Sequence, residues 1–387
     1  MSAWDPLAPE TLADPGPGWA ALLRDEPVHF YEKFEPPFYT LSRHADVAHA
    51  LRDIETYSSH YGQGPRFTTA GGLLSDPPEH TRFRRIVQRA FKPGAIEALR
   101  PRSERIARDL LGEVRGHALE LHDDFACPLP VILIAEMLGV PAAAREQFKR
   151  WSDVMVEAMG MPDPTPLAGE MEALACYLAG AVAEHRARPR GGDLIDTLVE
   201  ASETGDGLSD AQVVGVVSQL LVGGNETTTS LITNCVWRML ESPERWAELC
   251  ANPALVPAVI EESLRFDPPV LGLFRTTTRD VTLHGVAIPK GAKVYLCYAG
   301  ANRDPAVFSD PDRFRLDRAR REASEHLGFG LGVHHCLGSA LARLEAETAL
   351  AALVARFPRL SLAGPGERIK PWFLWGRRRL PLRTAVG

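Results

Sequence analysis

The stretch that most constrains this chain is FGLGVHHCLG (residues 329–338), which precedes a predicted helix over residues 339–357. Leu341, Leu344 and Ala352, with alanines between them, would give that helix a buried face. A cysteine at the start of a helix meets unpaired backbone N–H groups and the positive end of the helix dipole, and both favour a thiolate. The stretch therefore predicts either a reactive or metal-binding cysteine, or a buried structural cysteine beside a glycine turn.

Four residues of this stretch, Phe329, Gly332, Cys336 and Gly338, follow the spacing F-x-x-G-x-x-x-C-x-G. This spacing resembles the haem-binding loop of the haem-thiolate monooxygenases, the cytochrome P-450 family, and the resemblance covers nearly the whole chain. It implies that Cys336 ligates the iron of haem b and that Phe329, Gly332 and Gly338 surround the cofactor. His334 stands where many bacterial members direct a His or Arg at a haem propionate.

A second motif lies in a predicted helix within residues 76–91, where His80 and Arg84 are one turn apart on one face. Taken alone, the dense positive charge of this segment is typical of a solvated basic helix. The resemblance implies instead that His80 and Arg84, together with Arg275, contact haem propionates. The other basic residues of the segment would then face an acidic redox partner, and they are Arg82, Arg85, Arg89 and Lys92.

A long helix is predicted over about 210–240, with a capping box S-x-x-Q that starts at Ser209. Its centre, LLVGGNETTTS, allows two interpretations. In the first, residues 223–225 end one helix and Thr227 caps the next. In the second, which the resemblance implies, one helix is locally unwound against the haem. In the second case Glu226 and Thr227 match the family's acid–Thr pair, which relays protons and binds dioxygen by a hydrogen bond.

Glu262 and Arg265 are spaced i, i+3, which is usually a surface ion pair of little energetic value. They also match the family's E-x-x-R motif, whose partner is a downstream arginine. Arg313, in the sequence PDRF, is the matching residue. The resemblance implies that these three side chains form a buried triad that holds the cysteine loop in place.

The resemblance also implies an apolar substrate pocket. Methionines in a helix are more often ordinary core residues, and this alternative stays open for Met155. The predicted lining consists of Phe67, Leu73, Met155, Val222, Gly223, Leu271, Leu273 and Leu374.

Local signals near both ends of the chain predict further elements. PPFYTLS (36–42) predicts a strand, and the Ser42 hydroxyl is a candidate cap for a helix over residues 45–51. Residues 372–376 and 380–384 predict a final hairpin, whose tip near Leu374 would enter the pocket.

Composition limits the class of protein. The 387 residues are 45% apolar and 24% charged, with a formal charge of −7, so there is no overall cationic field for nucleic acid. The six cysteines are scattered without CxxC spacing, which favours a reducing cytoplasm, and neither a leader nor a membrane anchor is expected. We expect a single cytochrome P-450 domain over residues 1–387, of which 1–36 are loosely structured. The fold should be mainly α with a smaller, strand-rich portion at 274–308, a long helix over the haem and the cysteine loop beneath it.

The resemblance implies a monooxygenase that uses O2 and two electrons to hydroxylate a C–H bond of a terpenoid, steroid, fatty acyl or aromatic molecule. No flavin or nicotinamide fingerprint is present, so the electrons would come through a ferredoxin or flavodoxin from a separate NAD(P)H-dependent reductase. Two alternatives stay open: a peroxide-driven haem-thiolate enzyme, and a haem-binding sensor or carrier without catalysis. The acid–Thr pair favours the O2-dependent monooxygenase over both alternatives.

Overall fold

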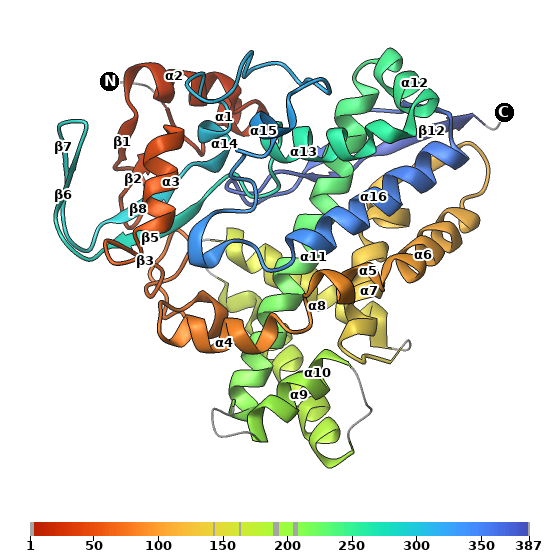
Figure 1. Cartoon of the computed structure of the whole chain (residues 1–387), viewed down its shortest axis with the longest axis horizontal. Helices are drawn as coiled ribbons and strands as arrows, with labels where there is room; N and C mark the ends of the chain where they lie inside the picture. The colour runs from red at the N-terminus through yellow and green to blue at the C-terminus, as the bar shows by residue number, and fades with distance from the viewer. Residues whose placement is uncertain (1–3, 142–143, 162–163, 189–192, 204–207, 386–387) are drawn as a thin grey trace. The chain divides into compact units, whose positions relative to one another are not determined.

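The structure is a computed structural model that describes residues 4–141, 144–161, 164–188, 193–203 and 208–385 (Figure 1). It is mainly helical with a smaller β portion, as the sequence predicts. The chain forms two compact units, each assembled from segments far apart in the sequence. Unit 1 comprises Met1–Thr81, Ala258–Cys336 and Trp372–Trp375, and unit 2 comprises Arg82–Pro257, Leu337–Pro371 and Gly376–Gly387.

Unit 1 contains a mixed sheet with the strand order β1-β2-β8-β5-β3. Figure 1 shows its red strands β1 and β2 beside the cyan strands β8 and β5. The β2–β8 pair is parallel and the other pairs are antiparallel. A separate hairpin, β6–β7, turns at His284 and Gly285, which both have positive φ. The strand bounds are β1 Val28–Tyr31, β2 Phe38–Leu41, β3 Tyr57–Ser58, β5 Leu273–Thr277, β6 Val281–Leu283, β7 Val286–Ile288 and β8 Lys293–Leu296.

Short helices flank this sheet in unit 1. Leu41, Val47, Leu51 and Leu296 are among the residues that form an apolar core between the sheet and α3. The helices are α1 Pro9–Ala13, α2 Gly16–Asp25, α3 His44–Arg52, α14 Tyr298–Ala301, α15 Arg320–Ala323 and the 3-10 turns Gly72–Leu74 and Gly332–His334. Two helices continue along the chain from one unit into the other, α4 Glu79–Val87 and α13 Val256–Phe266.

The expectation of a loosely structured segment over 1–36 is wrong for most of the described residues there. The segment forms α1, α2 and β1. Prolines stand in the first turn of both helices, where the missing N–H costs nothing, so they start helices instead of preventing them. Trp19 and Leu22 of α2 are buried, and β1 pairs with β2. The prolines and acidic residues therefore belong to ordered structure.

The expected cap of α3 is also wrong. The Ser42 hydroxyl donates to the carbonyl of Pro27 at 3.4 Å and does not cap the helix. The backbone N–H of His44, at the start of α3, instead donates to Asp304 Oδ2 at 2.9 Å. Asp304 is 260 residues away in the sequence, so no local pattern identifies it as the acceptor.

Unit 2 is built around α11, Asp210–Leu240, whose bounds agree with the predicted helix. Ser209 and Gln212 form the expected capping box. The helix contacts α7, α8, α9 and α16, and Figure 1 shows α16 (blue) passing alongside α11 (green). The helices of this unit are α5 Pro93–Glu97, α6 Arg100–Glu113, α7 Pro128–Met137, α8 Arg145–Gly160, α9 Ala168–Ala187, α10 Leu194–Glu203, α11, α12 Pro243–Ala251, α16 Ser339–Arg356, a π-helical turn His122–Ala126 and the 3-10 turns Thr165–Leu167 and Pro253–Leu255.

The predicted C-terminal hairpin is wrong. The last strand, β12 (Pro381–Ala385), lies between β4 (Ala118–Glu120) and β9 (Arg359–Leu362) in a three-stranded sheet. The preceding strand β11 (Arg377–Arg379) pairs with β10 (Glu367–Arg368). Local alternation predicts strands in this region, but the pairing partners lie elsewhere in the chain.

Candidate functional site

The cysteine loop in unit 1 is closed by its own backbone. The N–H of Cys336 donates to the carbonyl of Phe329 at 2.9 Å, so the two ends of the loop meet. Within it, the N–H of His335 donates to the carbonyl of Gly332 at 3.1 Å. Cys336 is partly buried and carries a thiol. The loop thus presents one sulfur just before Gly338, the N-cap residue of α16.

Gly332 is required by the geometry of this loop. Its φ is +73°, a conformation that L side chains rarely adopt. A Cβ at this position would also lie 2.6 Å from the carbonyl oxygen of Leu51 in α3. Gly338, in contrast, has an ordinary φ of −83°. The backbone conformation and the nearby Leu51 carbonyl, both within unit 1, therefore require glycine at position 332.

In the predicted triad the side chains of Glu262 and Arg265 pair, and the side chain of Arg318 stands in the place expected for Arg313. Glu262 and Arg265 of α13 are buried and paired, with Oε1 2.6 Å from Nη2. The second arginine on Glu262 is Arg318, whose Nε lies 3.0 Å from Oε2. Arg313 is exposed and contributes only its backbone carbonyl, which accepts from Arg265 at 3.0 Å. Arg318 lies five residues beyond the motif match, and no spacing signal separates it from its arginine neighbours.

Asn302 joins this triad to the cysteine loop, a role that sequence reasoning missed. Arg265 donates to the carbonyl of Asn302 at 3.0 Å. The Asn302 side-chain oxygen accepts from the N–H of Leu327 at 2.7 Å, directly before the loop. A Cβ at Gly328 would lie 2.7 Å from the carbonyl oxygen of Leu264, so loop and helix pack closely. The buried ion pairs thereby fix where the loop begins.

Unit 1 also gathers three of the four residues predicted to contact propionates. The rings of His80 and His334 have centroids 4.4 Å apart. Arg275, in β5, is 2% exposed and takes part in none of the ion pairs among the described residues. Burial, followed by the charges of Arg275 and His80, lowers the pKa of His334 to about 3, so its imidazole is neutral. Arg84 lies one helical turn after His80 in α4.

This cluster is rich in donors and poor in acceptors. The buried Nε2 of His334 has no hydrogen-bond partner among the described residues. Asp76 is the carboxylate that influences His334, and it already accepts from the backbone N–H of Ser59 at 2.8 Å. The buried guanidinium of Arg275 has no carboxylate partner among the described residues, and an anionic group would stabilise it.

In unit 2, the polar centre of α11 is continuous helix. The interpretation in which residues 223–225 end a helix is therefore wrong, and the local unwinding of the other interpretation is not seen either, because the helix is uninterrupted there. The polar side chains are accommodated because neighbouring elements supply partners. Asn225 donates to Ser152 of α8 at 2.7 Å, and Thr229 donates to the carbonyl of Ala126 at 3.3 Å. Thr227 donates to the carbonyl of Gly223 at 2.6 Å, within the helix itself.

Glu226 is 8% exposed and accepts a hydrogen bond from Ser230 at 3.3 Å. Burial, followed by repulsion from Asp153, raises its pKa to about 7, against weaker opposing effects of Arg378 and Lys149. A carboxyl group with this pKa exchanges protons readily near neutral pH. Sequence reasoning identified Glu226 but neither Ser230 nor Asp153 beside it.

Glu345 of α16 is a second buried carboxyl in unit 2, also missed by sequence reasoning. It is 2% exposed. Burial raises its pKa to about 8, in spite of a hydrogen bond with Thr228 of α11. The sequence places Glu345 within a helical segment of mixed polarity and gives no signal that it is buried.

Gly223 and Gly224 leave one side of α11 bare. A Cβ at either position would meet no atom within 4 Å, so packing does not explain the two glycines. Gly residues in a helix interior cost roughly 1 kcal/mol each relative to Ala. A ligand that lies flat against this turn would explain why the side chains are missing.

The predicted pocket residues fall in both units. In unit 1, Leu271 and Leu374 are buried, Leu73 and Leu273 are half-buried, and Phe67 is 50% exposed. Leu374 lies next to Val270 through an isolated β-bridge. In unit 2, Met155 is half-buried and Gly223 is exposed, while the side chain of Val222 lies outside the described part of the chain. A shallow groove in unit 2, on the β4-β12-β9 sheet, is lined by Leu119, Leu382 and other residues outside the predicted pocket.

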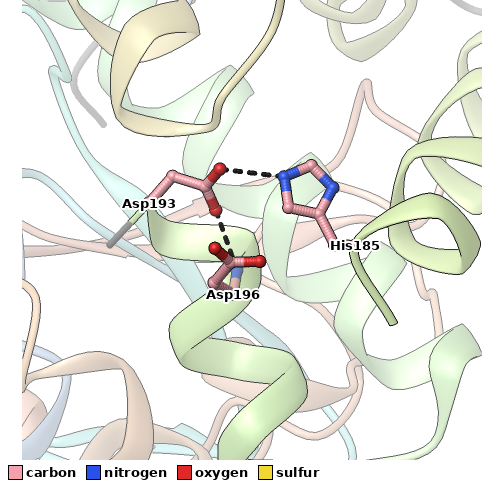
Figure 2. Close-up of side chains that lie close together, drawn as sticks. All are labelled: His185, Asp193 and Asp196. Carbon is pink, nitrogen blue, oxygen red and sulfur yellow. Dashed lines mark hydrogen bonds and ion pairs between the residues drawn. The ribbon is translucent and has the colours of Figure 1, made fainter. Parts of the chain in front are cut away.

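A separate cluster in unit 2, drawn in Figure 2, joins α9 to α10. His185 and Asp196 are buried, and the Nε2 of His185 lies 2.8 Å from Asp193 Oδ2. The Nδ1 of His185 must donate to the carbonyl of Ala181, because a carbonyl only accepts. Asp193 Oδ1 accepts from the N–H of Asp196 at 2.8 Å. Because both ring nitrogens face acceptors, the 2.8 Å contact of Nε2 with the carboxylate requires a protonated ring, and the resulting ion pair accounts for this geometry without a metal ion.

Comparison with known proteins gives the family. The sequence profile of the family described as Cytochrome P450 matches residues 31–372. The chain belongs to the cytochrome P450 family. Cytochrome P450 107B1 of Saccharopolyspora erythraea is 38% identical, over 95% of this chain and 94% of that protein. Erythromycin C-12 hydroxylase of the same organism is 38% identical over 94% and 93%.

Solved structures agree with this P450 assignment. The structure of Cytochrome P450 CYP109Q5 from Chondromyces apiculatus superposes with a TM-score of 0.90 at 36% identity, and the match covers 100% of both chains. The fold is therefore the P450 fold, and the protein is a P450 monooxygenase. Among the described residues, no helix has the length and apolar character needed to cross a membrane.

The cofactor of the P450 family is haem, and the residues described in unit 1 fit one. The cluster of Arg275, His334 and His80 suits a carboxylate, because the buried Arg275 guanidinium forms no ion pair among the described residues. A sulfur at the end of a tight glycine loop suits a thiolate ligand of iron. The family also implies use of O2 and of a redox partner.

Proposed function

We propose that this P450 binds haem b through the Cys336 thiolate and hydroxylates a C–H bond of an apolar small molecule. The observation that carries the proposal is the closed loop that presents Cys336, anchored through Asn302 to the buried triad. When bound, a thiolate-ligated haem supplies the oxygen chemistry that no amino-acid side chain provides. The protein would contribute by binding the cofactor, orienting the substrate and delivering protons.

His80, Arg84, Arg275 and His334 are proposed to bind the haem carboxylates. Arg275 supplies a permanent charge from a strand that pairs on both edges, with β3 and β8. The neutral ring of His334 carries its proton on the nitrogen that donates to the Leu73 carbonyl, so Nε2 would have to gain a proton to donate to a haem carboxylate. Phe329, Gly332 and Gly338 would shape the loop around the sulfur, with Gly332 permitting its conformation.

Glu226 and Thr227 are proposed to deliver protons. The raised pKa of Glu226 allows its carboxyl group to hold a proton and to release it near pH 7. Ser230 keeps one carboxylate oxygen in a fixed position, since its hydroxyl donates to Oε1. The Thr227 hydroxyl, on the next residue, would bind dioxygen or a water molecule by a hydrogen bond. The acid–Thr pair is the reason to favour oxygen activation over a peroxide-driven enzyme or a haem carrier.

The proposed substrate is apolar: a terpenoid, steroid, fatty acyl or aromatic molecule. The proposed lining residues with described side chains are apolar, and Gly223 leaves room beside α11. The name of the relative that hydroxylates erythromycin shows that similar chains accept a large organic molecule. The substrate class therefore rests on the apolar lining and not on any specific polar contact.

A separate ferredoxin or flavodoxin, reduced by an NAD(P)H-dependent reductase, is the proposed electron donor. Arg85, Arg89 and Lys92 are exposed in unit 2 and would attract an acidic protein. Attraction of this kind speeds the encounter and weakens with salt. Electron transfer should therefore slow as ionic strength rises.

Turnover under three conditions tests this function. The haem-loaded protein is given a fatty acid, a steroid and an aromatic probe with a surrogate ferredoxin, reductase and NADPH, with hydrogen peroxide alone, or with neither. Hydroxylated product that requires the redox proteins and O2 supports the proposal. Equal or faster product formation with peroxide alone would favour the peroxide-driven enzyme. A haem-loaded protein that binds the probes but forms no product under any condition would favour a sensor or carrier.

A further inference from the structure

Lys293, the first residue of β8, is a buried cation that the proposed reaction does not use. It is 1% exposed, although lysine is rarely buried without an ion-pair partner. Among the described residues no carboxylate forms an ion pair with it. Burial, followed by repulsion from Arg275, lowers its pKa to about 8. Burial of an ammonium group without a carboxylate partner is costly, so the presence of lysine at this position needs an explanation.

The three donors of the ammonium group are taken up by one loop. Lys293 Nζ donates to the carbonyls of Tyr61 at 2.9 Å, Gly62 at 3.0 Å and Gly64 at 3.2 Å. An ammonium has three N–H donors and no acceptor, so these carbonyls saturate it. The fourth carbonyl of the run, from Gln63, accepts from the N–H of Phe274 in β5 at 2.9 Å. Four consecutive carbonyls are thus fixed by two neighbouring strands.

The same loop is ordered by its own hydrogen bonds. The N–H of Thr68 donates to the carbonyl of Tyr61 at 3.2 Å, and the N–H of Ala70 donates to that of His60 at 2.9 Å. Gly62 has a φ of +84°, and a Cβ there would collide with the Thr68 side chain. The loop is therefore compact, and Lys293 connects its inner side to the sheet.

Phe67 links this arrangement to ligand recognition. The Lys293 ammonium lies 4.9 Å from the centroid of the Phe67 ring, a cation–π distance. Phe67 nevertheless remains 50% exposed, so the ring is held on one side and open on the other. The loop is attached to β5 at Phe274, next to Arg275 in the donor-rich cluster. An aromatic ring that is held on one side and exposed on the other is suited to contact a bound apolar molecule.

We propose that Lys293 is a specificity-determining positioning residue, whose ammonium ties the carbonyls of residues 61–64 and holds Phe67 against the substrate. This inference rests on the proposed function, because it takes Phe67 to face the substrate. Lys293 itself touches neither the substrate nor the cofactor. It acts by fixing the loop, in the way that remote packing residues set the geometry of a site.

The test compares Lys293→Met with Lys290→Met in the haem-loaded protein. Methionine keeps the length and apolar stem but removes all three donors, while Lys290 is exposed and lies three residues earlier. In K293M we expect the amides of Gly62, Thr68 and Ala70 to exchange about tenfold faster, because the loop opens more often. In K290M exchange at these amides should stay within about twofold. Unchanged exchange in K293M would overturn the proposal.

Ligand binding supplies the readout that a purely structural role would not move. Dissociation constants for dodecanoic acid, testosterone and naphthalene are measured by the spin-state shift. K293M should change their ratios by about tenfold, with KM affected more than kcat, and should keep the thiolate-type carbon monoxide spectrum. In a Phe67→Ala background, adding K293M should change the ratios by less than about twofold, since the ring it positions is gone. Equal effects in both backgrounds would contradict action through Phe67.

The outcomes separate this inference from the proposed function. If the wild type lacks a thiolate-type spectrum, the proposed function fails. The exchange comparison still tests whether the hydrogen bonds from Lys293 fix the loop. If K293M does not load haem, amide exchange in the wild-type protein tests the proposal instead. The amides of Gly62, Thr68 and Ala70 must then be protected against exchange about as well as those of β8. Exchange of these amides at the rate of unstructured chain would overturn the proposal.

Discussion

Glu262 lies between two buried guanidinium groups, with Oε1 2.6 Å from Arg265 Nη2 and Oε2 3.0 Å from Arg318 Nε. Both arginines also donate to backbone carbonyls of the segment that follows α14, including those of Ser309 and Pro311. One carboxylate therefore organises a helix and a long irregular segment. Through Asn302 the arrangement continues to Leu327, at the beginning of the cysteine loop.

Removal of Arg318 should be severe and removal of Arg313 mild. In Arg318→Ala the carboxylate of Glu262 loses one of its two buried guanidinium partners, which typically costs about 3–5 kcal/mol. Arg313→Ala removes an exposed side chain and keeps the backbone carbonyl, so it should cost about 0.5 kcal/mol or less. Urea titrations of the two haem-loaded variants measure both effects. Equal loss in both variants would restore Arg313 as the third member of the triad.

This difference shows what sequence can predict here and what it cannot. The E-x-x-R spacing follows from one helical turn, so Glu262 and Arg265 were predictable. Arg318 reaches Glu262 across 56 residues, and its identity depends on how an irregular segment folds. The same reason explains why Asp304 was missed as the cap of α3. The α11 helix, in contrast, was predicted over its full length, because its capping box is local.

The alternatives at residues 223–225 show a similar limit. Gly-Gly-Asn is a strong local signal for a helix end, but α11 continues because Asn225 and Thr229 find partners on neighbouring elements. In the N-terminal segment, prolines begin two helices that pack within the folded unit. Tertiary partners decide both cases.

Gly332→Ala should disrupt the cysteine loop. Alanine is strained at a φ of +73°, and its Cβ would lie 2.6 Å from a backbone oxygen that has little freedom to move. We expect a haem content at least about fivefold lower, or a loss of the thiolate-type spectrum. Gly112→Ala in α6 is the matched control, because a Cβ there meets nothing and alanine favours a helix. Normal haem content and spectrum in Gly332→Ala would refute the argument.

Glu226 should make stability depend on pH. Its folded-state pKa of about 7 exceeds the ordinary value of 4.5, so between these values the native protein keeps a proton that the unfolded chain has released. Stability should therefore fall as pH rises through this window, by up to about 3 kcal/mol from this group. Glu226→Gln does not titrate and should gain stability relative to wild type between pH 4 and 8. Urea titrations at both pH values measure this gain, and Glu248→Gln, an exposed carboxyl in α12, is the control.

An absence of pH dependence in the difference between wild type and Glu226→Gln would mean that the pKa of Glu226 is the same in the folded and the unfolded protein. Relief through Arg378 or Lys149, which favour the carboxylate, would then offset the cost of burial. Such a result would weaken the assignment of Glu226 as a proton donor near neutral pH.

Thr227→Ala should uncouple electron use from product formation. The variant keeps α11 intact, because the lost hydroxyl bonds only to Gly223 within the same helix. We expect NADPH consumption within a few-fold of wild type, a fall of about tenfold in product per NADPH, and more hydrogen peroxide. Thr227→Ser retains a hydroxyl and should restore most of the coupling. Unchanged product per NADPH in Thr227→Ala would remove this residue from proton delivery.

The carbon monoxide difference spectrum of the dithionite-reduced protein tests the central claim most directly. If Cys336 ligates the iron as a thiolate, the Soret band is strongly red-shifted, and it is lost in Cys336→Ser. A wild-type band at the position typical of histidine-ligated haem would contradict this assignment and would point to His334 or His335 as the ligand. A purified protein that binds no haem at all would contradict the proposed function as a whole.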